Sequence, residues 1–363
     1  MRKEDWRGRR VLVTGHTGFK GAWLSLLLSR LEAEVAGFAL QPPTDPSLFA
    51  EARVQDFLAD HRVGDVRDPD ALSRSLHEAE PEVVFHLAAQ PLVRRSYRDP
   101  VETYTTNVVG TLNLLEALRT TPSVRAAVVV TSDKCYRNAE WDHAYRESDP
   151  LGGNDPYSAS KAATEIIVAS YSASYFQRDQ TGSSVPAVAT VRAGNVIGGG
   201  DWAEDRLIPD LMRGLSSGRM VPIRNPQAIR PWQHVLEPLN GYLTVAEYLL
   251  TAGEEHVGAW NLGPRTEDAQ PVSWVADRVV ANWSESAGGW VRDGEPHPPE
   301  ATYLRLDWSR AYQRLGWHPH WDVEEALRRT VAWYRQEQGG ADARKLTLSD
   351  IDDHLEAARK AVQ

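Results

Sequence analysis

The chain has 363 residues, of which 42% are hydrophobic and 25% charged, a balance typical of a globular protein with a large core. Its formal net charge of −10 argues against general attraction to nucleic acid or to an anionic membrane. The single cysteine, Cys135, excludes an intrachain disulfide, and the eleven histidines show no metal-ligand spacing. Because we find no secretory leader and no apolar run of membrane length, we expect a cytoplasmic protein with no metal site.

Strand-like and helix-like segments alternate through the first half of the chain. The expected strands span residues 10–14, 35–40, 58–63, 82–87, 126–131 and 187–191, and the expected helices span 22–31, 101–119 and 156–176. A long connection, 41–57, separates the second strand from the third. This alternation predicts an α/β fold of the Rossmann type, with a doubly wound parallel sheet covered by helices on both faces.

The composition and the pattern of the sequence change after Gly194. Ten of the thirteen tryptophans lie at or beyond Trp202, and the alternation of strands and helices weakens. We therefore expect a sheet domain over residues 1–193 and a smaller C-terminal lobe over residues 194–363. Within the second part, residues 260–262 are predicted to form a late strand that returns to the sheet, and 323–336 a final amphipathic helix.

A glycine-rich loop, Gly15 to Gly21, lies between the first strand and the first helix. Its three glycines allow a tight turn and a close backbone approach to a pyrophosphate, which the helix N-terminus also favours. The loop comprises Gly15, His16, Thr17, Gly18, Phe19, Lys20 and Gly21. Lys20 has two equal interpretations, because its ammonium group either holds a phosphate or projects into solvent. The end of the second strand has neither an acid for a ribose diol nor an arginine for a 2′-phosphate, so these residues do not decide between NAD and NADP.

Tyr157 and Lys161 are four residues apart at the start of the long helix predicted over 156–176, so they share one face. A lysine ammonium beside a phenol favours the phenolate, and we therefore expect the pKa of Tyr157 to be lowered toward neutrality. Thr131, at the end of the preceding strand, is expected to hydrogen-bond to a substrate hydroxyl or to the Tyr157 oxygen. The arrangement predicts proton transfer next to a bound dinucleotide.

Together these motifs resemble the extended short-chain dehydrogenase/reductase family of NAD-dependent epimerases and dehydratases. The likeness covers nearly the whole chain and rests on T-G-x-x-G-x-x-G from Thr14, H-L-A-A-Q at 86–90, N-V-V-G-T at 107–111 and Y-x-x-x-K at Tyr157. It implies NAD as cofactor and a homodimer formed through helices 101–119 and 156–176. The further cofactor contacts that it implies are Asp65, Val66, Leu87, Ala88, Ala89, Gln90, Asn107, Tyr157 and Lys161. Asp65 has the alternative of being a plain turn residue.

Within the family, four segments resemble the 4,6-dehydratases that act on CDP-glucose. They are the loop 15–21, T-S-D-K-C-Y at 131–136, R-A-G-N-V-I-G-G-G-D-W at 192–202 and R-P-W-Q-H-V at 230–235. This likeness implies a nucleoside-diphosphate sugar, CDP-glucose, as substrate, and Asp133 as the acid that protonates the departing C6 hydroxyl. Related dTDP-glucose enzymes carry a glutamate base at the next position, where this chain has Lys134, so the C5 base stays open. The expected catalytic residues are Thr131, Ser132, Asp133, Lys134, Tyr157 and Lys161.

Substrate contacts are expected mainly from the C-terminal lobe. Arg206 and Leu207 open a helix, which would present a guanidinium group and free amides to a pyrophosphate. The full set of expected substrate contacts is Gln90, Ser132, Asn195, Arg206, Leu207, Arg230 and His234. Two other functions remain open: a nucleotide-sugar 4-epimerase, against which Asp133 argues, and a non-catalytic dinucleotide sensor, against which the Tyr157–Lys161 pair argues.

Overall fold

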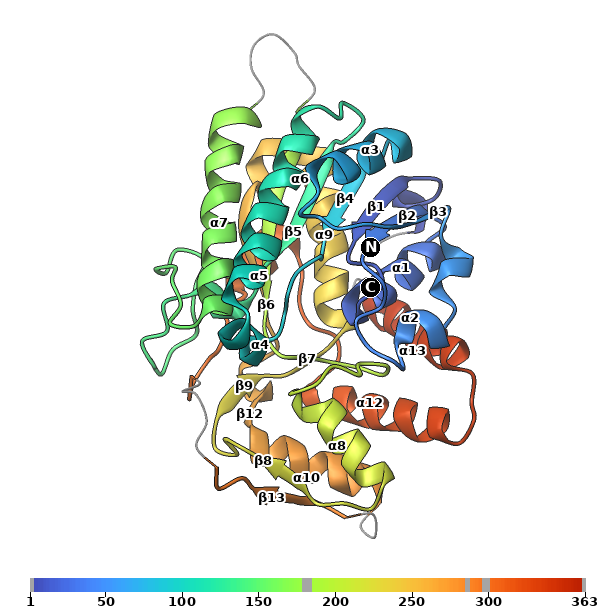
Figure 1. Ribbon diagram of the computed structural model, residues 1–363, viewed down its shortest axis with the longest axis vertical. Coiled ribbons are helices and arrows are strands. Elements are labelled where there is room, and N and C mark those ends of the chain that lie inside the picture. The colour runs from blue at the N-terminus through green and yellow to red at the C-terminus, as the bar shows by residue number, and fades with distance from the viewer. Residues whose placement is uncertain (1–2, 178–184, 285–287, 296–300, 361–363) are drawn as a thin grey trace.

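The computed structural model describes residues 3–177, 185–284, 288–295 and 301–360. Its centre is a seven-stranded sheet in the order β11-β6-β5-β4-β1-β2-β3, and every neighbouring pair is parallel (Figure 1). The strands are β1 Arg10–Thr14, β2 Glu34–Ala39, β3 Asp60–Val63, β4 Val83–His86, β5 Ala126–Val130, β6 Ala187–Ala193 and β11 Gly258–Leu262. This topology confirms the predicted Rossmann-type sheet and the predicted late strand.

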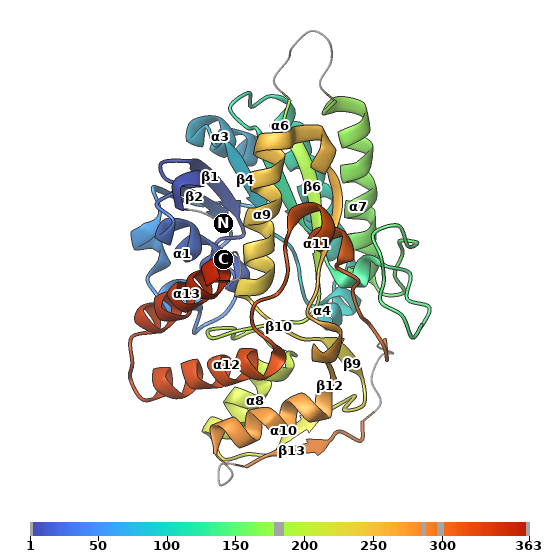
Figure 2. The ribbon, with the colours of Figure 1, turned by 180° about the vertical axis from the view of Figure 1, so that it is seen from behind.

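Helices cover both faces of the sheet, and this explains why its strands are almost continuously apolar. Side chains alternate along each strand, so Val11 and Val13 join the core on one face while Leu12 joins the core on the other. The first face is covered by α1 Phe19–Arg30 and α9 Leu236–Ala252, which lie before the sheet in Figure 2. The second face is covered by α3 Pro69–Ala79, α6 Gly110–Arg119 and α7 Pro156–Tyr175.

Two helical predictions need correction. The helix predicted over 101–119 is a run of α5 Pro100–Tyr104, a π-helical turn at Thr105–Val109 and α6. The helix predicted as the last one, α12 Val323–Gln338, is followed by α13 Ala343–Lys360. The sequence of α13 is strongly polar, and its few apolar residues, including Ile351 and Leu355, bury against the core that α1 and α12 share, so its pattern was weak.

The long connection at 41–57 contains two short helices, α2 Leu48–Glu51 and η2 Val54–Phe57, so it is not a plain loop. Loops at the carboxyl edge of the sheet carry α4 Val93–Arg98 and η4 Asp133–Cys135. Among the described residues, no helix is both long and apolar enough to cross a membrane.

The lower part of the molecule in Figure 1 is a separate group of short strands and helices. It contains α8 Leu207–Ser216, β8 Val221–Ile223, β9 Ile229–Pro231, β12 Ala269–Pro271, α10 Val272–Trp283, β13 Trp290–Arg292 and α12. The pair β7 Val196–Ile197 and β10 Gln233–His234 links it to the sheet, whereas α11 Ser309–Leu315 packs beside β11. We call this group the lobe; the boundary at residues 193 and 194 stays a prediction.

Candidate active site

The glycine loop lies directly after β1, at the carboxyl edge of the sheet. Gly15 has a φ of +75°, and a Cβ there would lie 2.7 Å from the backbone nitrogen of Ala88. A Cβ on Gly21 would lie 2.1 Å from the carbonyl oxygen of Gly15, so both positions require glycine. A Cβ on Gly18 would meet only that oxygen, at 3.4 Å, which leaves this side of the loop open to a ligand. The loop and the first turn of α1 therefore fit a dinucleotide pyrophosphate.

Two side chains of the loop brace it from inside. His16 is fully buried, and its Nε2 lies 2.7 Å from Nδ1 of His61 on β3. Burial and the neighbouring His61 lower the pKa of His16 to about 4, so the ring is neutral at pH 7. Thr17 donates a hydrogen bond from Oγ1 to the carbonyl of Leu40, 2.8 Å away. Only the backbone of His16 is therefore placed to contact a cofactor, whereas the sequence had suggested the whole residue.

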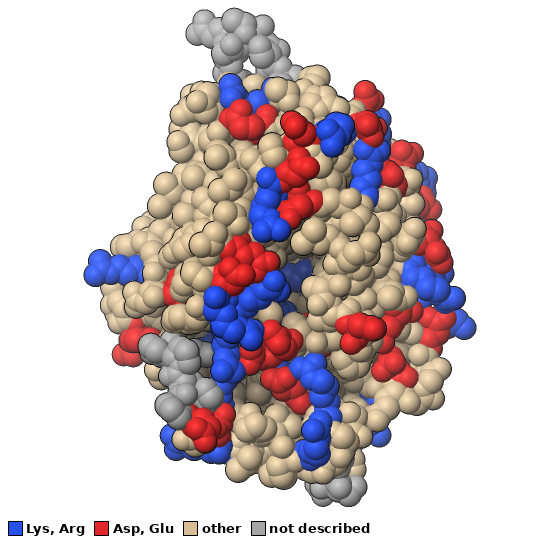
Figure 3. Space-filling model, viewed as in Figure 1, with Lys and Arg blue, Asp and Glu red and all other residues tan. Residues whose placement is uncertain are grey.

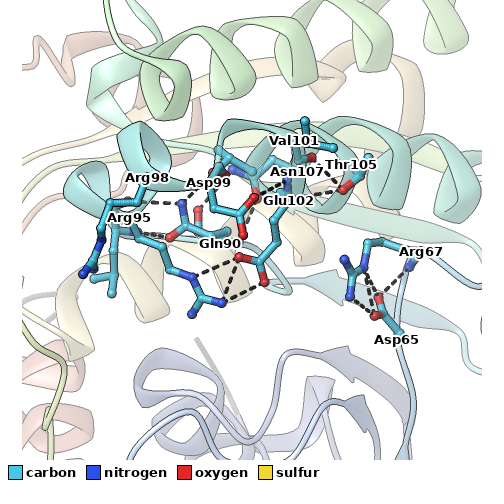
Figure 4. Close-up of polar contacts among 12 residues, drawn as sticks. Asp65, Arg67, Gln90, Arg95, Arg98, Asp99, Val101, Glu102, Thr105 and Asn107 are labelled. Atoms are coloured by element: carbon cyan, nitrogen blue, oxygen red, sulfur yellow. Dashed lines mark hydrogen bonds and ion pairs between the residues drawn. The ribbon is translucent and has the colours of Figure 1, made fainter.

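Asp65, predicted to contact adenine, is held by its own turn (Figure 4). Its Oδ1 accepts a hydrogen bond from the backbone nitrogen of Arg67 at 2.9 Å, and its Oδ2 pairs with the guanidinium group of the same arginine. This hydrogen bonding lowers the pKa of Asp65. Val66 is buried, and its carbonyl accepts a hydrogen bond from Asn113. The geometry favours a braced turn, and an adenine contact stays a prediction.

Gln90 and Asn107 fasten the loop after β4, which also carries Leu87, Ala88 and Ala89 (Figure 4). The Gln90 amide donates to Thr103 Oγ1 at 2.8 Å and to Leu92 O at 3.1 Å, and its oxygen accepts from Leu92 N. Asn107, in the π-helical turn, exchanges hydrogen bonds with the Gln90 backbone and donates to Ser160 Oγ. With both ends of its amide occupied, Gln90 is a poor candidate for the predicted substrate contact and a good one for positioning.

Tyr157 and Lys161 lie one turn apart on α7, as their spacing predicted. The Lys161 ammonium donates a 3.0 Å hydrogen bond to Val130 O, at the end of β5. Burial lowers the pKa of Lys161 to about 8 and raises the pKa of Tyr157 to about 12. The expected lowering of the Tyr157 pKa is therefore wrong for the protein without ligands, because loss of solvent around the phenol dominates.

Ser132, and not Thr131, is the hydroxyl that faces Tyr157. The Thr131 hydroxyl points toward α7 and β6 instead, where it donates to Glu165 and, at 3.2 Å, to Val191 O. Ser132 Oγ donates to Asp133 Oδ1 at 3.0 Å, and its hydrogen bonding to the phenol offsets part of the rise in the Tyr157 pKa. Neighbouring residues of an extended chain point to opposite sides, which explains the displacement by one residue from the prediction.

Asp133 is enclosed rather than part of an exposed turn. Its side chain is only 3% exposed, and Oδ2 has no hydrogen-bond partner among the described residues. Burial raises the pKa of this carboxyl group, which favours the protonated form that a general acid needs. Lys134 follows, partly exposed, and its backbone nitrogen donates to Ser132 Oγ at 3.1 Å.

A buried polar network next to β5, which we call the catalytic strand because it leads into Thr131, Ser132 and Asp133, was not predicted. Glu165, one turn beyond Lys161 on α7, forms a 2.8 Å ion pair with Arg192 of β6. Thr190 donates to the same carboxylate, and Arg192 also donates to the Tyr136 hydroxyl. The sequence did contain a signal for this network, because Glu165 and Arg192 are opposite charges, one within the predicted helix 156–176 and the other directly after the predicted strand 187–191. Such charges are buried only when they are paired.

The lobe brings two of the predicted arginines toward this cluster. Arg206 precedes α8, whose first residue is Leu207, and its guanidinium group pairs with Asp201 at 2.9 Å rather than capping the helix. Its charge acts on the Tyr157 phenol, and the charge of Arg230 acts on Asp133. Arg230 is buried on β9 and donates to the carbonyl of Ile229 at 2.9 Å.

Asn195 and His234 have different placements. Asn195 lies in the turn between β6 and β7, where its carbonyl accepts from Gln233 N. His234 is fully buried, with ring centroids 5.7 Å from Trp23 and 5.0 Å from Trp321. Burial lowers the pKa of His234 to about 3, so the ring is a neutral core group. This packing argues against the substrate contact expected of His234.

The surface is hollowed between the sheet and the lobe, and Lys and Arg side chains are visible within the hollow and along its edge (Figure 3). Arg94 of α4 and Arg224, which follows β8 of the lobe, both pair with Asp205, so this carboxylate links the loop after β4 to the lobe. The described residues contain no group of three or more His, Cys, Asp or Glu side chains placed to hold a metal ion.

Known proteins match the chain along most of its length. It is similar to the curated CDP-glucose 4,6-dehydratase of Salmonella typhimurium, with 50% identity over 358 residues and 99% of each chain covered. It is also similar in structure to the epimerase Mth375 of Methanothermobacter thermautotrophicus, with a TM-score of 0.79, 22% identity and coverage of 93% and 95%. A complex of MoeE5 with UDP-glucuronic acid and NAD has a TM-score of 0.74, 25% identity and coverage of 90% and 99%.

The family model described as GDP-mannose 4,6 dehydratase matches residues 12–330. This match spans the glycine loop, the catalytic strand, α7 and most of the lobe. The chain therefore belongs to the GDP-mannose 4,6 dehydratase family, within the superfamily of NAD-dependent epimerases and dehydratases that its motifs predicted.

Proposed function

We propose that the chain is an NAD-dependent 4,6-dehydratase that converts CDP-glucose to CDP-4-keto-6-deoxyglucose. The observation that carries the reaction type is Asp133, a buried carboxyl group beside Ser132 and near Tyr157, one oxygen of which has no partner in the described part of the chain. Such a group has no use in simple oxidation of a carbinol, whereas loss of water needs an acid. The identity of the sugar nucleotide is supported by the 50% identical relative, which is a CDP-glucose 4,6-dehydratase.

The glycine loop, the turn at Asp65 and Val66, and the segment Leu87–Gln90 would hold NAD along the carboxyl edge of the sheet. The complex of MoeE5 with NAD, on a similar fold, supports this cofactor. When bound, NAD supplies a place for the hydride removed from sugar carbon 4 until that hydride returns to carbon 6. Lys161, fixed to Val130 O, would anchor the cofactor ribose beside Tyr157.

The protein groups move the protons. Tyr157, hydrogen-bonded through Ser132, takes the proton of the C4 hydroxyl as the C4 hydride leaves, which produces a 4-ketone. The ketone acidifies C5–H, and transfer of that proton to a protein base, with protonation of O6 by Asp133, expels water. Hydride return to C6 and a proton returned to C5 complete the product. Tyr157 acts as a base only as the phenolate, so the phenol, whose pKa burial raises, first has to lose its own proton; the hydrogen bond from Ser132 and the charge of Arg206 both favour that loss.

The decisive experiment incubates the protein and NAD with CDP-, UDP-, dTDP- and GDP-glucose and measures product mass. We expect a product lighter by one water from CDP-glucose and much less from the others. No dehydrated product from any of the four would overturn the proposal.

Isotope labels separate this reaction from that of a 4-epimerase. Substrate deuterated at C4 is expected to give product deuterated at C6, and unlabelled substrate in heavy water is expected to gain deuterium at C5. An epimerase would return the label to C4 and leave C5 unlabelled. A non-catalytic sensor would change neither substrate nor label.

The surface of α5 to α7 supports the expected homodimer. Val101 is 72% exposed, Ile166 is 58% exposed, and Tyr104 and Val109 are also exposed nearby on the same helical layer. Apolar residues gathered on neighbouring helices are typical of a subunit interface. Sedimentation should show a dimer for the wild-type protein and a monomer for Ile166→Glu. A wild-type monomer at micromolar concentration would contradict the proposal.

A further inference from the structure

Tyr136 ends the six-residue segment 131–136, which leads from the catalytic strand through the η4 turn, and it takes no part in the proton transfers of the proposed reaction. Its side chain is almost completely buried. Its hydroxyl donates to Asn261 Oδ1 on β11 at 2.6 Å and accepts from Arg192 Nη1 on β6 at 2.8 Å. Burial raises the pKa of Tyr136, so the hydroxyl keeps its proton and does not serve as a base.

One buried ion pair holds both ends of this segment. At its start the Thr131 hydroxyl donates to Glu165, and at its end the Tyr136 hydroxyl accepts from Arg192. Glu165 and Arg192 are joined at 2.8 Å through the other carboxylate oxygen and the other arm of the guanidinium group. The guanidinium carbon also lies 4.8 Å from the centroid of the Tyr136 ring. The η4 turn therefore lies between two side-chain anchors that meet at the same ion pair.

Asp133 depends on the backbone of this turn for its position. In the described part of the chain its Oδ1 accepts a hydrogen bond from Ser132 at 3.0 Å, and its Oδ2 has no partner. A Cβ on Gly194 would lie 3.1 Å from Oδ2, so the carboxyl group lies close against the chain that follows β6. An acid transfers its proton from hydrogen-bonding distance, and a displacement of about 1 Å can cost about 100-fold in rate. A small movement of η4 would therefore misplace the acid.

We propose that Tyr136 is a positioning residue, which fixes the η4 turn so that Asp133 meets the departing C6 hydroxyl of the substrate. This inference rests on the proposed function, in which the 4-ketone forms first and water leaves second. A backbone hydrogen bond from Gly152 N to Cys135 O, 2.9 Å long, also holds the turn. That bond joins the turn only to another loop, whereas the Tyr136 hydroxyl joins it to β6 and β11 of the sheet. Loss of the hydroxyl should therefore slow elimination more than oxidation.

Tyr136→Phe removes the hydroxyl and keeps the ring, and Tyr145→Phe is its matched control. Tyr145 is also buried and stacks on Tyr136, with ring centroids 5.2 Å apart. Its hydroxyl donates to Asn138 Oδ1 at 2.8 Å and accepts from Ala139 N at 2.7 Å, so its hydrogen bonds end in its own loop. Each variant loses a donated and an accepted hydrogen bond, but only Tyr136→Phe loses those that join the turn to the sheet.

Rapid mixing of the protein and NAD with CDP-glucose separates the two steps, because NADH absorbs light between C4 oxidation and hydride return. Tyr136→Phe should form NADH at nearly the wild-type rate, accumulate it, and form product about tenfold more slowly, the scale of one lost hydrogen bond. Tyr145→Phe should match the wild-type protein in both steps. Product formation by Tyr136→Phe at the wild-type rate would overturn the inference. Equal slowing of both steps would also overturn it, because a generally loosened site gives that result.

Arg192→Lys tests the same anchor if Tyr136→Phe does not fold. An ammonium group keeps the charge beside Glu165, but it lacks the second arm with which the guanidinium group reaches the Tyr136 hydroxyl. This variant should also accumulate NADH during turnover. A wild-type balance between NADH formation and product formation would overturn the inference.

The wild-type reaction keeps the two proposals apart. If the wild-type protein forms the dehydrated product and Tyr136→Phe forms it with the same balance of steps, only the role of Tyr136 fails. If the wild-type protein forms no dehydrated product from CDP-glucose, the proposed function fails, and a role for Tyr136 in elimination fails with it.

Discussion

Two buried carboxylates near the carboxyl end of β5, Glu165 and Asp133, have opposite surroundings. Beneath the strand, both oxygens of Glu165 accept hydrogen bonds, from Thr131 on one side and from Thr190 and Arg192 on the other. At the carboxyl end of the strand, Asp133 has one oxygen bound to Ser132 and the other without a partner in the described structure. Both side chains are almost completely buried, so burial alone does not distinguish them.

The difference teaches which buried charge serves the fold and which serves chemistry. A buried carboxylate whose two oxygens both accept hydrogen bonds is compensated for its loss of solvent and orders the elements around it, whereas one with an unpartnered oxygen is destabilising and needs another reason to exist. Glu165 is a carboxylate of the first kind, and Asp133 is one of the second kind. Functional sites are where such perturbed groups gather.

The largest expected effect on stability comes from breaking the buried ion pair between Glu165 and Arg192. Glu165→Gln should lower the free energy of unfolding by about 3 kcal/mol, because Arg192 would keep a buried charge without its ion pair. Urea unfolding measures the change. The control is Glu116→Gln on α6, whose ion pair with Arg119 is exposed and should be worth less than about 1 kcal/mol. Equal losses in the two variants would remove the distinction between the two regions.

Tyr157→Phe tests the site at the carboxyl end of β5, where we expect a large loss of activity and little loss of stability. The variant should lose roughly 100-fold or more in turnover, because the group that takes the C4 hydroxyl proton is absent. Its stability should change little, because the phenol hydrogen-bonds to Ser132 within the site, whereas the hydrogen bonds that tie Tyr157 to Ser96 and Ser160 use its backbone and are kept. Turnover is measured by product mass and stability by urea unfolding. Near-normal turnover would exclude Tyr157 from the mechanism.

Much of the fold was predictable from local patterns. Strands such as β1 and β5 are short apolar runs followed by glycine or polar residues, and the spacing of Tyr157 and Lys161 correctly placed both on one face of α7. The π-helical turn around Asn107 was not predictable, because it interrupts an otherwise regular helical pattern. Helix α13 was missed because its contacts with α1 and α12 are tertiary, and a mostly polar sequence gives little periodic signal.

The site was predictable as a set of residues but not as a set of contacts. His234 belongs to a segment typical of the family, yet its ring packs against Trp23 and Trp321, which lie far away in the sequence. The pKa of Tyr157 depends on burial by many segments, and a spacing rule contains only the effect of Lys161. Whether a side chain at the end of a strand points up or down depends on register, and this decided between Thr131 and Ser132.

A pair of variants at these neighbouring positions sharpens the comparison further. Thr131→Val removes a donor to Glu165 and should cost about 1–2 kcal/mol of stability with a smaller effect on turnover. Ser132→Ala should reduce turnover by about tenfold, the scale of one lost hydrogen bond to a reacting group, with little change in stability. Urea unfolding and product assays are run on both. The reverse pattern would assign the catalytic hydroxyl to Thr131.

Asp133→Asn should change stability by a small amount, and the change should be a gain. Burial raises the pKa of this carboxyl group in the folded state above its value in the unfolded chain. Above the folded-state pKa the buried carboxylate therefore destabilises the protein, and this cost disappears as the pH falls toward the unfolded-state value near about 4. A neutral amide of the same shape avoids the cost, so the variant should be more stable at pH 7 by about 1 kcal/mol.

The same substitution removes the acid that expels water. Asp133→Asn should therefore form the 4-ketone and retain bound NADH, seen by absorbance or fluorescence, while little dehydrated product appears. The gain in stability should be present at pH 7 and absent near pH 4, a dependence that the exposed control Asp142→Asn would lack. A variant that is less stable at pH 7, yet makes product at the wild-type rate, would place Asp133 with Glu165 among the structural groups. Gain of stability together with loss of water elimination would identify a carboxyl group that the fold keeps at a cost because the reaction requires it.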